Sequence, residues 1–140
     1  MKTAVIYWSG TGNTEAMANA VAEGMKEAGA EVTLLTPEQV NAADLGSYGA
    51  IAFGCPAMGS EVLEEMDFQP MFDGCKSSIG GKRVALFGSY GWGDGQWMRD
   101  WEARMQSAGA ELVGGAGLMC HETPDAEGLE ECKELGRQLA

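Results

Sequence analysis

The sequence YWSGTGNTEAM, residues 7–17, decides the fold of this 140-residue chain. It begins at the end of an apolar run, Lys2–Trp8, that is typical of a buried strand, and it leads into a helical pattern over Thr14–Ala28. A glycine-rich turn between a strand and a helix can hold an anion, because the first N–H groups of the helix and its dipole both favour negative charge. Because the turn contains no Lys or Arg, we expect an anion there to be held by neutral donors.

Short apolar runs alternate with segments of helical period along the rest of the chain. The predicted strands are Lys2–Trp8, Glu31–Leu35, Ala50–Gly54, Arg83–Gly88 and a glycine-broken Glu111–Met119. The predicted helices are Thr14–Ala28, Gln96–Ala108 and Asp125–Leu139, with a short helix between Pro37 and Leu45 and a partial one within Val62–Phe72. Five strands alternating with helices indicate an α/β fold, a doubly wound five-stranded parallel sheet with helices on both faces. At this length, residues 1–140 are expected to form a single domain.

The composition is acidic, with 9 Lys and Arg residues against 21 Asp and Glu and a formal net charge of -12. Such a surface repels nucleic-acid phosphates and anionic lipid headgroups, so we expect no nucleic acid and no membrane as a partner. The four cysteines form no CxxC pair and no zinc spacing, and the N-terminal apolar run is too short for a signal sequence. A cytoplasmic protein with reduced thiols and no metal site is therefore expected.

Three glycine-rich or turn-rich stretches follow the first, third and fourth predicted strands. They are SGTGNT at 9–14, CPAMGSE at 55–61 and SYGWGDG at 89–95. In a doubly wound sheet, ligands bind beyond the carboxyl ends of the strands, at the point where the strand order reverses. We therefore expect the three loops to converge on one edge of the sheet and to form a binding site there.

The loop at 9–14 matches neither of two familiar phosphate motifs. The Walker A motif requires a Lys that is absent here, and the dinucleotide fingerprint GxGxxG fails because Glu15 occupies the third glycine position. Hydroxyl and amide side chains in the loop add donors to its N–H groups, which suits a terminal phosphate monoester held without a metal. The alternative is an ordinary helix N-terminus capped by Ser9 or Thr11, and the loop alone does not decide between the two.

The other two loops each offer an apolar side chain to a flat ligand. Met58 is soft and polarizable, which suits contact with an aromatic ring. The alternative is a turn before a helix, capped by Ser60, with Met58 in the core, and this loop alone is weak evidence. Trp92 stands between Gly91 and Gly93, so its indole is free either to lie over a planar ring or to fold back on the core. Together the three loops indicate a ligand with a phosphate at one end and a flat aromatic system at the other.

The stretches VIYWSGTGNTEAM, GCPAMGSEVLEE and VALFGSYGWGDGQWM resemble the corresponding motifs of flavodoxins, specifically the short-chain kind from anaerobic bacteria. The similarity covers essentially the whole chain, and the predicted order of strands and helices agrees with it. The resemblance implies the flavodoxin-like strand order 2-1-3-4-5, with FMN as the cofactor where that order reverses. That order is the known one of the family and does not come from the residue pattern.

The resemblance also implies which residues hold FMN. The phosphate would be bound by Ser9, Gly10, Thr11, Gly12, Asn13 and Thr14. The ring system would be surrounded by Pro56, Ala57, Met58, Gly59, Ser60, Glu61, Ser89, Tyr90, Gly91, Trp92 and Gly93. Among these, Met58 and Trp92 would flank the two faces of the ring, and Glu61 would accept a hydrogen bond from its N3–H. The redox switch of the family is a flip of the peptide that corresponds to Gly59–Ser60.

The implied function is that of a low-potential one-electron carrier, not an enzyme. FMN, bound without a covalent link, would alternate between semiquinone and hydroquinone and pass electrons between larger redox enzymes, in place of ferredoxin. A monomer is expected, with transient redox partners that present basic docking surfaces. Two alternatives remain open: a small NAD(P)H-dependent quinone or FMN reductase on a related fold, for which no nicotinamide site is evident, and a flavin-free binding module.

Overall fold

All strand pairs in the sheet are parallel. The computed structural model describes residues 1–59 and 61–140. The strands are β1 Lys2–Tyr7, β2 Glu31–Leu35, β3 Ala50–Gly54, β4 Arg83–Tyr90, β5 Glu111–Leu112 and β6 Leu118–His121. The strand order is β2-β1-β3-β4-β5, with β6 also paired to β4, which confirms the predicted α/β fold and the order 2-1-3-4-5.

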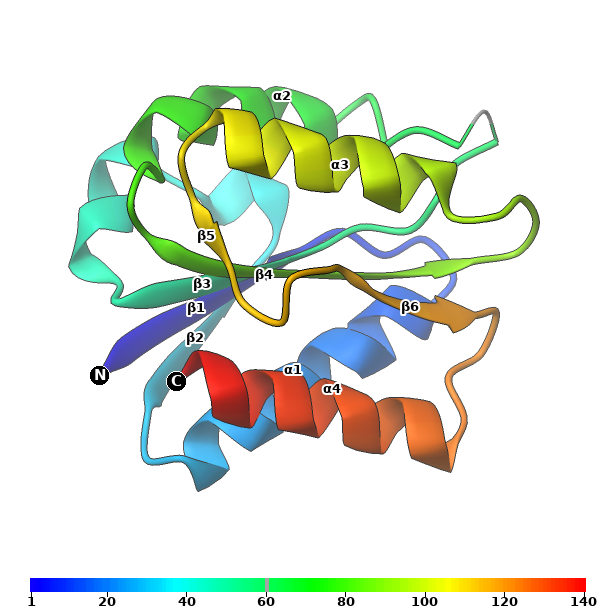
Figure 1. Ribbon diagram of the computed structural model, residues 1–140, viewed down its shortest axis with the longest axis horizontal. Helices are drawn as coiled ribbons and strands as arrows, with labels where there is room; N and C mark the ends of the chain where they lie inside the picture. Colours follow the sequence, from blue (N-terminus) through cyan, green and yellow to red (C-terminus); the bar gives the residue numbers. More distant parts are fainter. Residues whose placement is uncertain (60) are drawn as a thin grey trace.

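Helices cover both faces of the sheet, as the alternating pattern predicts (Figure 1). The helices are α1 Asn13–Glu27, α2 Phe68–Cys75, α3 Gln96–Ser107 and α4 Ala126–Leu139. α1 and α4 lie side by side on one face, and α2 and α3 lie on the other. The segment between Pro37 and Leu45, where a short helix is predicted, instead contains parts of two 3-10 turns, Pro37–Gln39 and Ala42–Ser47. Within the described residues, no helix has both the length and the apolar character needed to cross a membrane.

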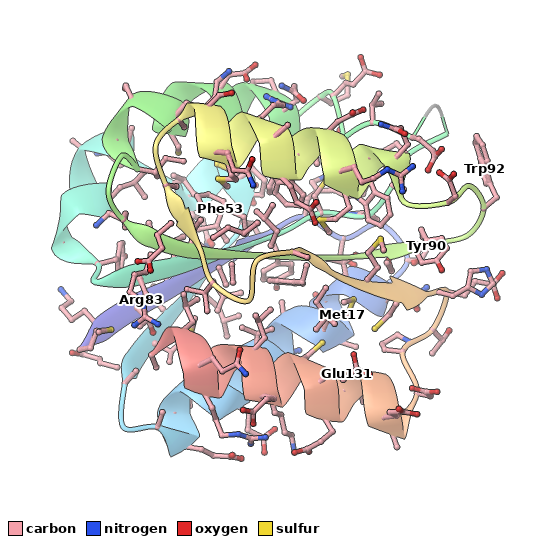
Figure 2. All side chains as sticks on the ribbon, viewed as in Figure 1. Met17, Phe53, Arg83, Tyr90, Trp92 and Glu131 are labelled. Atoms are coloured by element: carbon pink, nitrogen blue, oxygen red, sulfur yellow. The ribbon has the colours of Figure 1, made fainter. Side chains whose placement is uncertain are left out.

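Two apolar layers, one on each face of the sheet, attach the helices to it. In the layer under α2 and α3, the rings of Phe68 and Phe72 pack edge-on against Trp101, with centroid distances of 5.4 and 6.0 Å. Phe53 belongs to this layer and Met17 to the one under α1 and α4, and both are fully buried (Figure 2). Burial on both faces is why the central strands have continuous apolar sequences.

The fifth strand is divided, which differs from the single run predicted over Glu111–Met119. β5 pairs with the start of β4 and β6 with its end, while Gly114 and Gly115 between them have φ values of 86° and 79°. Positive φ takes the backbone out of the extended region, so strand pairing stops there. β6 resumes the pairing and ends beside the end of β4, at the edge where the predicted loops lie.

α2 begins at Phe68, later than the helical pattern within Val62–Phe72 suggests. The carboxylate of Glu64, a residue only 4% exposed, accepts hydrogen bonds from the N–H groups of Met66, Asp67 and Phe68, each at 2.8 Å. Glu64 therefore occupies the turn before the helix and supplies acceptors for N–H groups that have none within it. Burial by itself would raise the pKa of Glu64, but the three N–H donors together outweigh burial and hold that pKa below its ordinary value.

We expect Glu64→Gln to lower the free energy of unfolding by about 2 kcal/mol at neutral pH, because hydrogen bonds to a charged acceptor are lost. A carboxyl whose pKa is lowered by folding stabilises the native state above its unfolded pKa, and this contribution disappears as the pH falls through the folded pKa. The deficit of the variant should therefore shrink below about pH 4.3, the ordinary glutamate value. Urea unfolding of both chains at neutral pH and at about pH 3 measures it. An equal deficit at both pH values would contradict this role.

Candidate functional site

The loops after β1, β3 and β4 meet at the carboxyl edge of the sheet and surround a cavity of about 270 Å³. In Figure 2, Tyr90 and Trp92 mark this edge at the end of β4, while Arg83 marks the start of the same strand at the opposite edge. The cavity is lined by Trp8, Ser9, Gly10, Thr11, Asn13, Thr14, Pro56, Ala57, Met58, Ser89, Tyr90, Gly91 and Glu122. The three stretches that the sequence pattern indicates thus come together in space.

Ser9 organises the first loop through its hydroxyl, which accepts the N–H groups of Gly12 at 3.1 Å and Glu15 at 3.2 Å. Gly12 is the N-cap residue of α1 and has a φ of 97°, a left-handed conformation in which a larger residue would be strained. No side chain at the N-cap position bonds to the helix. The alternative of an ordinary helix N-terminus capped by Ser9 or Thr11 therefore holds only in part. Ser9 accepts N–H groups at the start of α1, but it lies outside the N-cap position.

The N–H groups of Thr11, Asn13 and Thr14 donate to no other residue that the structure describes. All three residues line the cavity. Free N–H groups at the start of a helix are suited to an anion, and the dipole of α1 adds to the attraction. Among the described residues, no Lys, Arg or His lines this cavity. The donors that face it are therefore neutral, as the loop sequence predicts.

A buried pair of hydroxyl groups joins the first loop to the third. The Oγ1 of Thr14 and the Oγ of Ser89 are 2.9 Å apart, and both residues are buried and line the cavity. Since one hydroxyl donates to the other, one hydroxyl hydrogen of the pair remains available to a ligand. The N–H of Ala57 also donates to the carbonyl of Ser89 at 3.0 Å, which ties the second loop to the third. Direct hydrogen bonds between the loops therefore hold the walls of the cavity.

The second loop is a tight turn whose Glu61 side chain bonds to the start of α3. The N–H of Glu61 donates to the carbonyl of Met58 at 2.8 Å, and its carboxylate accepts the N–H of Gln96 at 3.1 Å. Met58 lines the cavity, whereas Gly59 and Glu61 do not. Ser60 lies outside the described residues, so the flip of the Gly59–Ser60 peptide stays a prediction.

Tyr90 and Trp92, both in the segment after the buried part of β4, have different surroundings. Tyr90 lines the cavity, and its ring packs against Trp97 and His121 with centroid distances of 5.8 and 5.1 Å. Trp92 is 62% exposed and does not line the cavity. Figure 2 shows its indole extending from the loop toward solvent. The alternative in which Trp92 folds back onto the core is wrong, and its indole stands free beside Gly91, which does line the cavity.

Cys55, where β3 meets the second loop, is a buried thiol with a structural role. Burial raises the pKa of Cys55 to about 12, so the thiol does not ionise at neutral pH. Its carbonyl accepts the indole N–H of Trp97 at 3.2 Å, and its sulfur accepts the N–H of Glu64 at 3.4 Å. Cys55 thus connects the second loop to α3 and to the turn before α2.

Two residues that line the cavity are absent from the predicted set. Trp8 follows β1 directly and its ring lies against Gly10, but a Trp at the end of an apolar run reads as part of the strand. Glu122 follows β6 with a positive φ of 57°, which no local sequence signal indicates. Conversely, Gly12 and Gly93 belong to the predicted loops but do not line the cavity.

These features define a class of protein: one that holds a phosphorylated aromatic group where the strand order of a doubly wound sheet reverses, without a cationic side chain. The free N–H groups and hydroxyls of the first loop suit a phosphate. Trp8, Met58 and Tyr90 give the cavity apolar and aromatic walls, which suit a flat ring system. The residues present therefore fit FMN, the cofactor implied by the sequence.

Comparison with known proteins identifies the family. The flavodoxin family model matches residues 5–136. The flavodoxin of Megasphaera elsdenii is 48% identical over 136 residues, which cover 97% of this chain and 96% of that protein. The flavodoxin of Clostridium beijerinckii is 46% identical over 136 residues, which cover 97% of each.

Solved structures agree with this result. The solution structure of two-electron reduced Megasphaera elsdenii flavodoxin has a TM-score of 0.87 at 45% identity, covering 98% of this chain and 97% of that chain. A flavodoxin from the domain Archaea has a TM-score of 0.89 at 30% identity, covering 100% of this chain and 96% of that chain. The chain therefore belongs to the flavodoxin family. It is a flavoprotein that carries electrons at low potential on FMN and has transient redox partners; it is neither a flavin reductase nor a flavin-free module.

Proposed function

We propose that residues 1–140 act as one FMN-binding domain that passes single electrons between larger redox enzymes in the cytoplasm, in place of ferredoxin. The observation that carries the proposal is the set of free N–H groups at Thr11, Asn13 and Thr14, three residues that line a cavity bounded by three loops. A phosphate held there meets neutral donors only. The surroundings of the cofactor then stay negative overall, and a negative environment favours a low reduction potential.

The first loop would hold the FMN phosphate. The residues involved would be Ser9, Gly10, Thr11, Gly12, Asn13 and Thr14. The hydroxyl oxygen of Ser9 already accepts two N–H groups, which leaves its own hydrogen free to donate to a phosphate oxygen. Binding would therefore complete a set of hydrogen bonds around a loop that Ser9 has already shaped.

The second and third loops would enclose the ring system. Met58 would contact one face from within the cavity, and the exposed indole of Trp92 would cover the other. The carboxylate of Glu61 accepts one N–H, from Gln96, and has further lone pairs with which to accept the flavin N3–H. The remaining wall would come from Pro56, Ala57, Gly59, Ser60, Ser89, Tyr90, Gly91 and Gly93.

When bound, FMN supplies one-electron redox chemistry, and the chain supplies binding and electrostatics. Glu61 and Glu122 are two of the acidic residues that the described loops bring to this edge. A carboxylate about 10 Å from an added negative charge opposes it by about 0.4 to 1.7 kcal/mol at dielectric constants of 80 to 20. For one electron this amounts to about 20 to 70 mV toward lower potential per carboxylate, before screening by salt.

Partner docking would use the same edge of the molecule. The net charge of -12 favours partners with basic surfaces and opposes self-association, so the chain would act as a monomer. Val62, Met66 and Trp92, in or after the second and third loops, are exposed apolar residues that a partner surface would cover during a transient encounter.

FMN should bind more tightly as the ionic strength rises, because salt screens the repulsion between the phosphate dianion and a chain of net charge -12. Going from about 0.01 M to about 0.15 M salt shortens the Debye length from about 30 to about 8 Å and should lower the Kd by about 2- to 10-fold. Fluorescence titration of the apoprotein with FMN measures this, with uncharged riboflavin as the control that should hardly respond. A Kd for FMN that increases with salt would indicate a cationic phosphate site.

The proposed function is tested with reduced holoprotein and a basic haem protein as electron acceptor. The holoprotein should reduce the acceptor quickly at low salt and more slowly at high salt, since the encounter depends on opposite charges. Supplied with NADH or NADPH alone, the holoprotein should show no continuous oxidation of the nucleotide. Steady nucleotide oxidation without a second protein would contradict the role of a carrier.

A further inference from the structure

A fourth segment reaches the cofactor site, from a part of the chain that the sequence motifs do not include. β6 pairs with the end of β4 in a register that places His121 opposite Tyr90. The next residue, Glu122, donates its N–H to the carbonyl of Tyr90 at 2.7 Å and lines the cavity. In Figure 1 the end of β6, in orange, lies at the same edge as the end of β4.

The backbone of Glu122 is strained. Its φ of 57° lies in the left-handed region, and among the described residues only Glu61, with a φ of 50°, is another non-glycine with positive φ. Such a conformation costs free energy and persists where the surroundings hold it, which happens most often at functional sites. Here the hydrogen bond from the N–H of Glu122 to the carbonyl of Tyr90 ties this backbone to the end of β4, beside the cavity.

His121 contacts the third loop in two ways. Its ring lies against the ring of Tyr90, with centroids 5.1 Å apart and an interplanar angle of 59°. Its Nε2 is 3.1 Å from the carbonyl oxygen of Gly91. Because a carbonyl can only accept, Nε2 carries a hydrogen and donates it. Tyr90 and Gly91 both line the cavity and His121 does not, so His121 contacts two residues of this wall from outside the cavity lining.

We propose that His121 and Glu122 form a fourth loop of the FMN site, in which His121 positions the third loop and Glu122 presents a carboxylate to the cofactor. The inference rests on the proposed function, since it assigns two more residues to the same site. The carboxylate of a residue that lines the cavity opposes negative charge on the cofactor, so Glu122 favours oxidised over reduced FMN. His121 affects binding of both forms, because it acts through the position of Tyr90 and Gly91.

The effect of the Glu122 charge on FMN is tested with Glu122→Gln. Glu122→Asn is a second variant, which also removes the charge and has a side chain that tolerates positive φ. Both should lower the ratio of the Kd for fully reduced FMN to the Kd for oxidised FMN by about 2- to 5-fold, which raises the potential of the two-electron couple by about 10 to 20 mV at about 30 mV per tenfold. The matched control is Glu111→Gln, an exposed carboxylate at the start of β5, near the opposite edge, which should change the ratio less. Equal ratios in the Glu122 variants and the control would overturn the role of Glu122.

The role of His121 in positioning the third loop is tested by comparing His121→Phe with His121→Gln. The Phe variant keeps a ring against Tyr90 but loses the N–H donor, and its Kd for oxidised FMN should rise by about 3- to 10-fold. The Gln variant keeps a donor and should bind FMN more tightly than the Phe variant. A Phe variant that binds like the wild type, or a Gln variant as weak as the Phe variant, would overturn the role of His121.

The wild-type titration separates this inference from the proposed function. If the wild-type chain binds FMN and the variants at both positions bind it identically, the fourth loop is wrong and the proposed function stands. If the wild-type chain does not bind FMN, both are wrong. Unfolding of each apoprotein in urea checks that a weaker Kd does not reflect a loss of the fold.

Discussion

Riboflavin, which has the flavin ring and ribityl chain but no phosphate, is expected to bind at least about 100-fold more weakly than FMN, a difference of about 2.8 kcal/mol. The N–H groups of Thr11, Asn13 and Thr14 have no acceptor within the described part of the chain, so they contribute to binding only when an anion is present. Hydrogen bonds to a charged group each contribute about 1.5 to 3 kcal/mol, and several of them outweigh the repulsion from the acidic surface.

Titration of two threonine variants with FMN and with riboflavin tests whether the phosphate is bound at the first loop. Thr11 lines the cavity, whereas Thr33 is an exposed residue of β2, outside its lining. Thr11→Ala keeps the backbone N–H and removes only the hydroxyl, so it should weaken FMN binding by part of this difference and leave riboflavin binding unchanged. Thr33→Ala should change the binding of neither. Riboflavin binding within a few-fold of FMN would mean that the phosphate lies outside the first loop.

The largest loss of stability is expected from Gly136→Ala, by about 3 kcal/mol, because α1 and α4 touch through their backbones. A methyl group at Gly136 would run into the carbonyl oxygen of Val21 on α1, and one at Gly24 would run into the carbonyl of Lys133 on α4. A backbone carbonyl cannot rotate away as a side chain can, so the helices would have to separate. The higher helix propensity of Ala, about 1 kcal/mol, does not offset this.

Gly74→Ala is the matched control, because Gly74 also lies in a helix, α2, but a Cβ there would meet nothing within 4 Å. That variant should be slightly more stable than the wild type, by about 0.5 to 1 kcal/mol. Urea unfolding of both apoproteins measures the difference. A Gly136→Ala chain as stable as the wild type would show that α1 and α4 can move apart at little cost.

Much of the fold can be predicted from the sequence because burial on both faces of the sheet leaves a clear pattern. β2 and β3 begin and end at the predicted residues, and α3 ends one residue before its predicted end. The fifth strand and α2 differ from prediction for reasons that arise in three dimensions. The break in the fifth strand depends on the positive φ of Gly114 and Gly115, and α2 starts late because Glu64, an acid in an acidic stretch, is buried as an acceptor.

The candidate site likewise has a part that the sequence predicts and a part that it does not. The three loops can be predicted, because each directly follows a parallel strand and all such ends meet at one edge. Trp8 could not be recognised, since an aromatic residue at the end of an apolar run looks like part of the strand. Glu122 depends on the register between β4 and β6, and that register depends on where the broken fifth strand resumes. Trp8 and Glu122 reach the cavity lining because each is hydrogen-bonded to the end of a neighbouring strand, at Gly54 and Tyr90 respectively, and no short sequence motif encodes that pairing.

The most direct test of the account is the visible spectrum of the purified holoprotein during stepwise anaerobic reduction, recorded with a set of redox dyes. A one-electron carrier should take up its electrons in two separate steps, with a long-wavelength absorption band that rises in the first and disappears in the second. The second step should lie at the lower potential, as expected for a cofactor held by neutral donors in an acidic chain. Direct passage to the fully reduced flavin in one two-electron step would contradict the central claim.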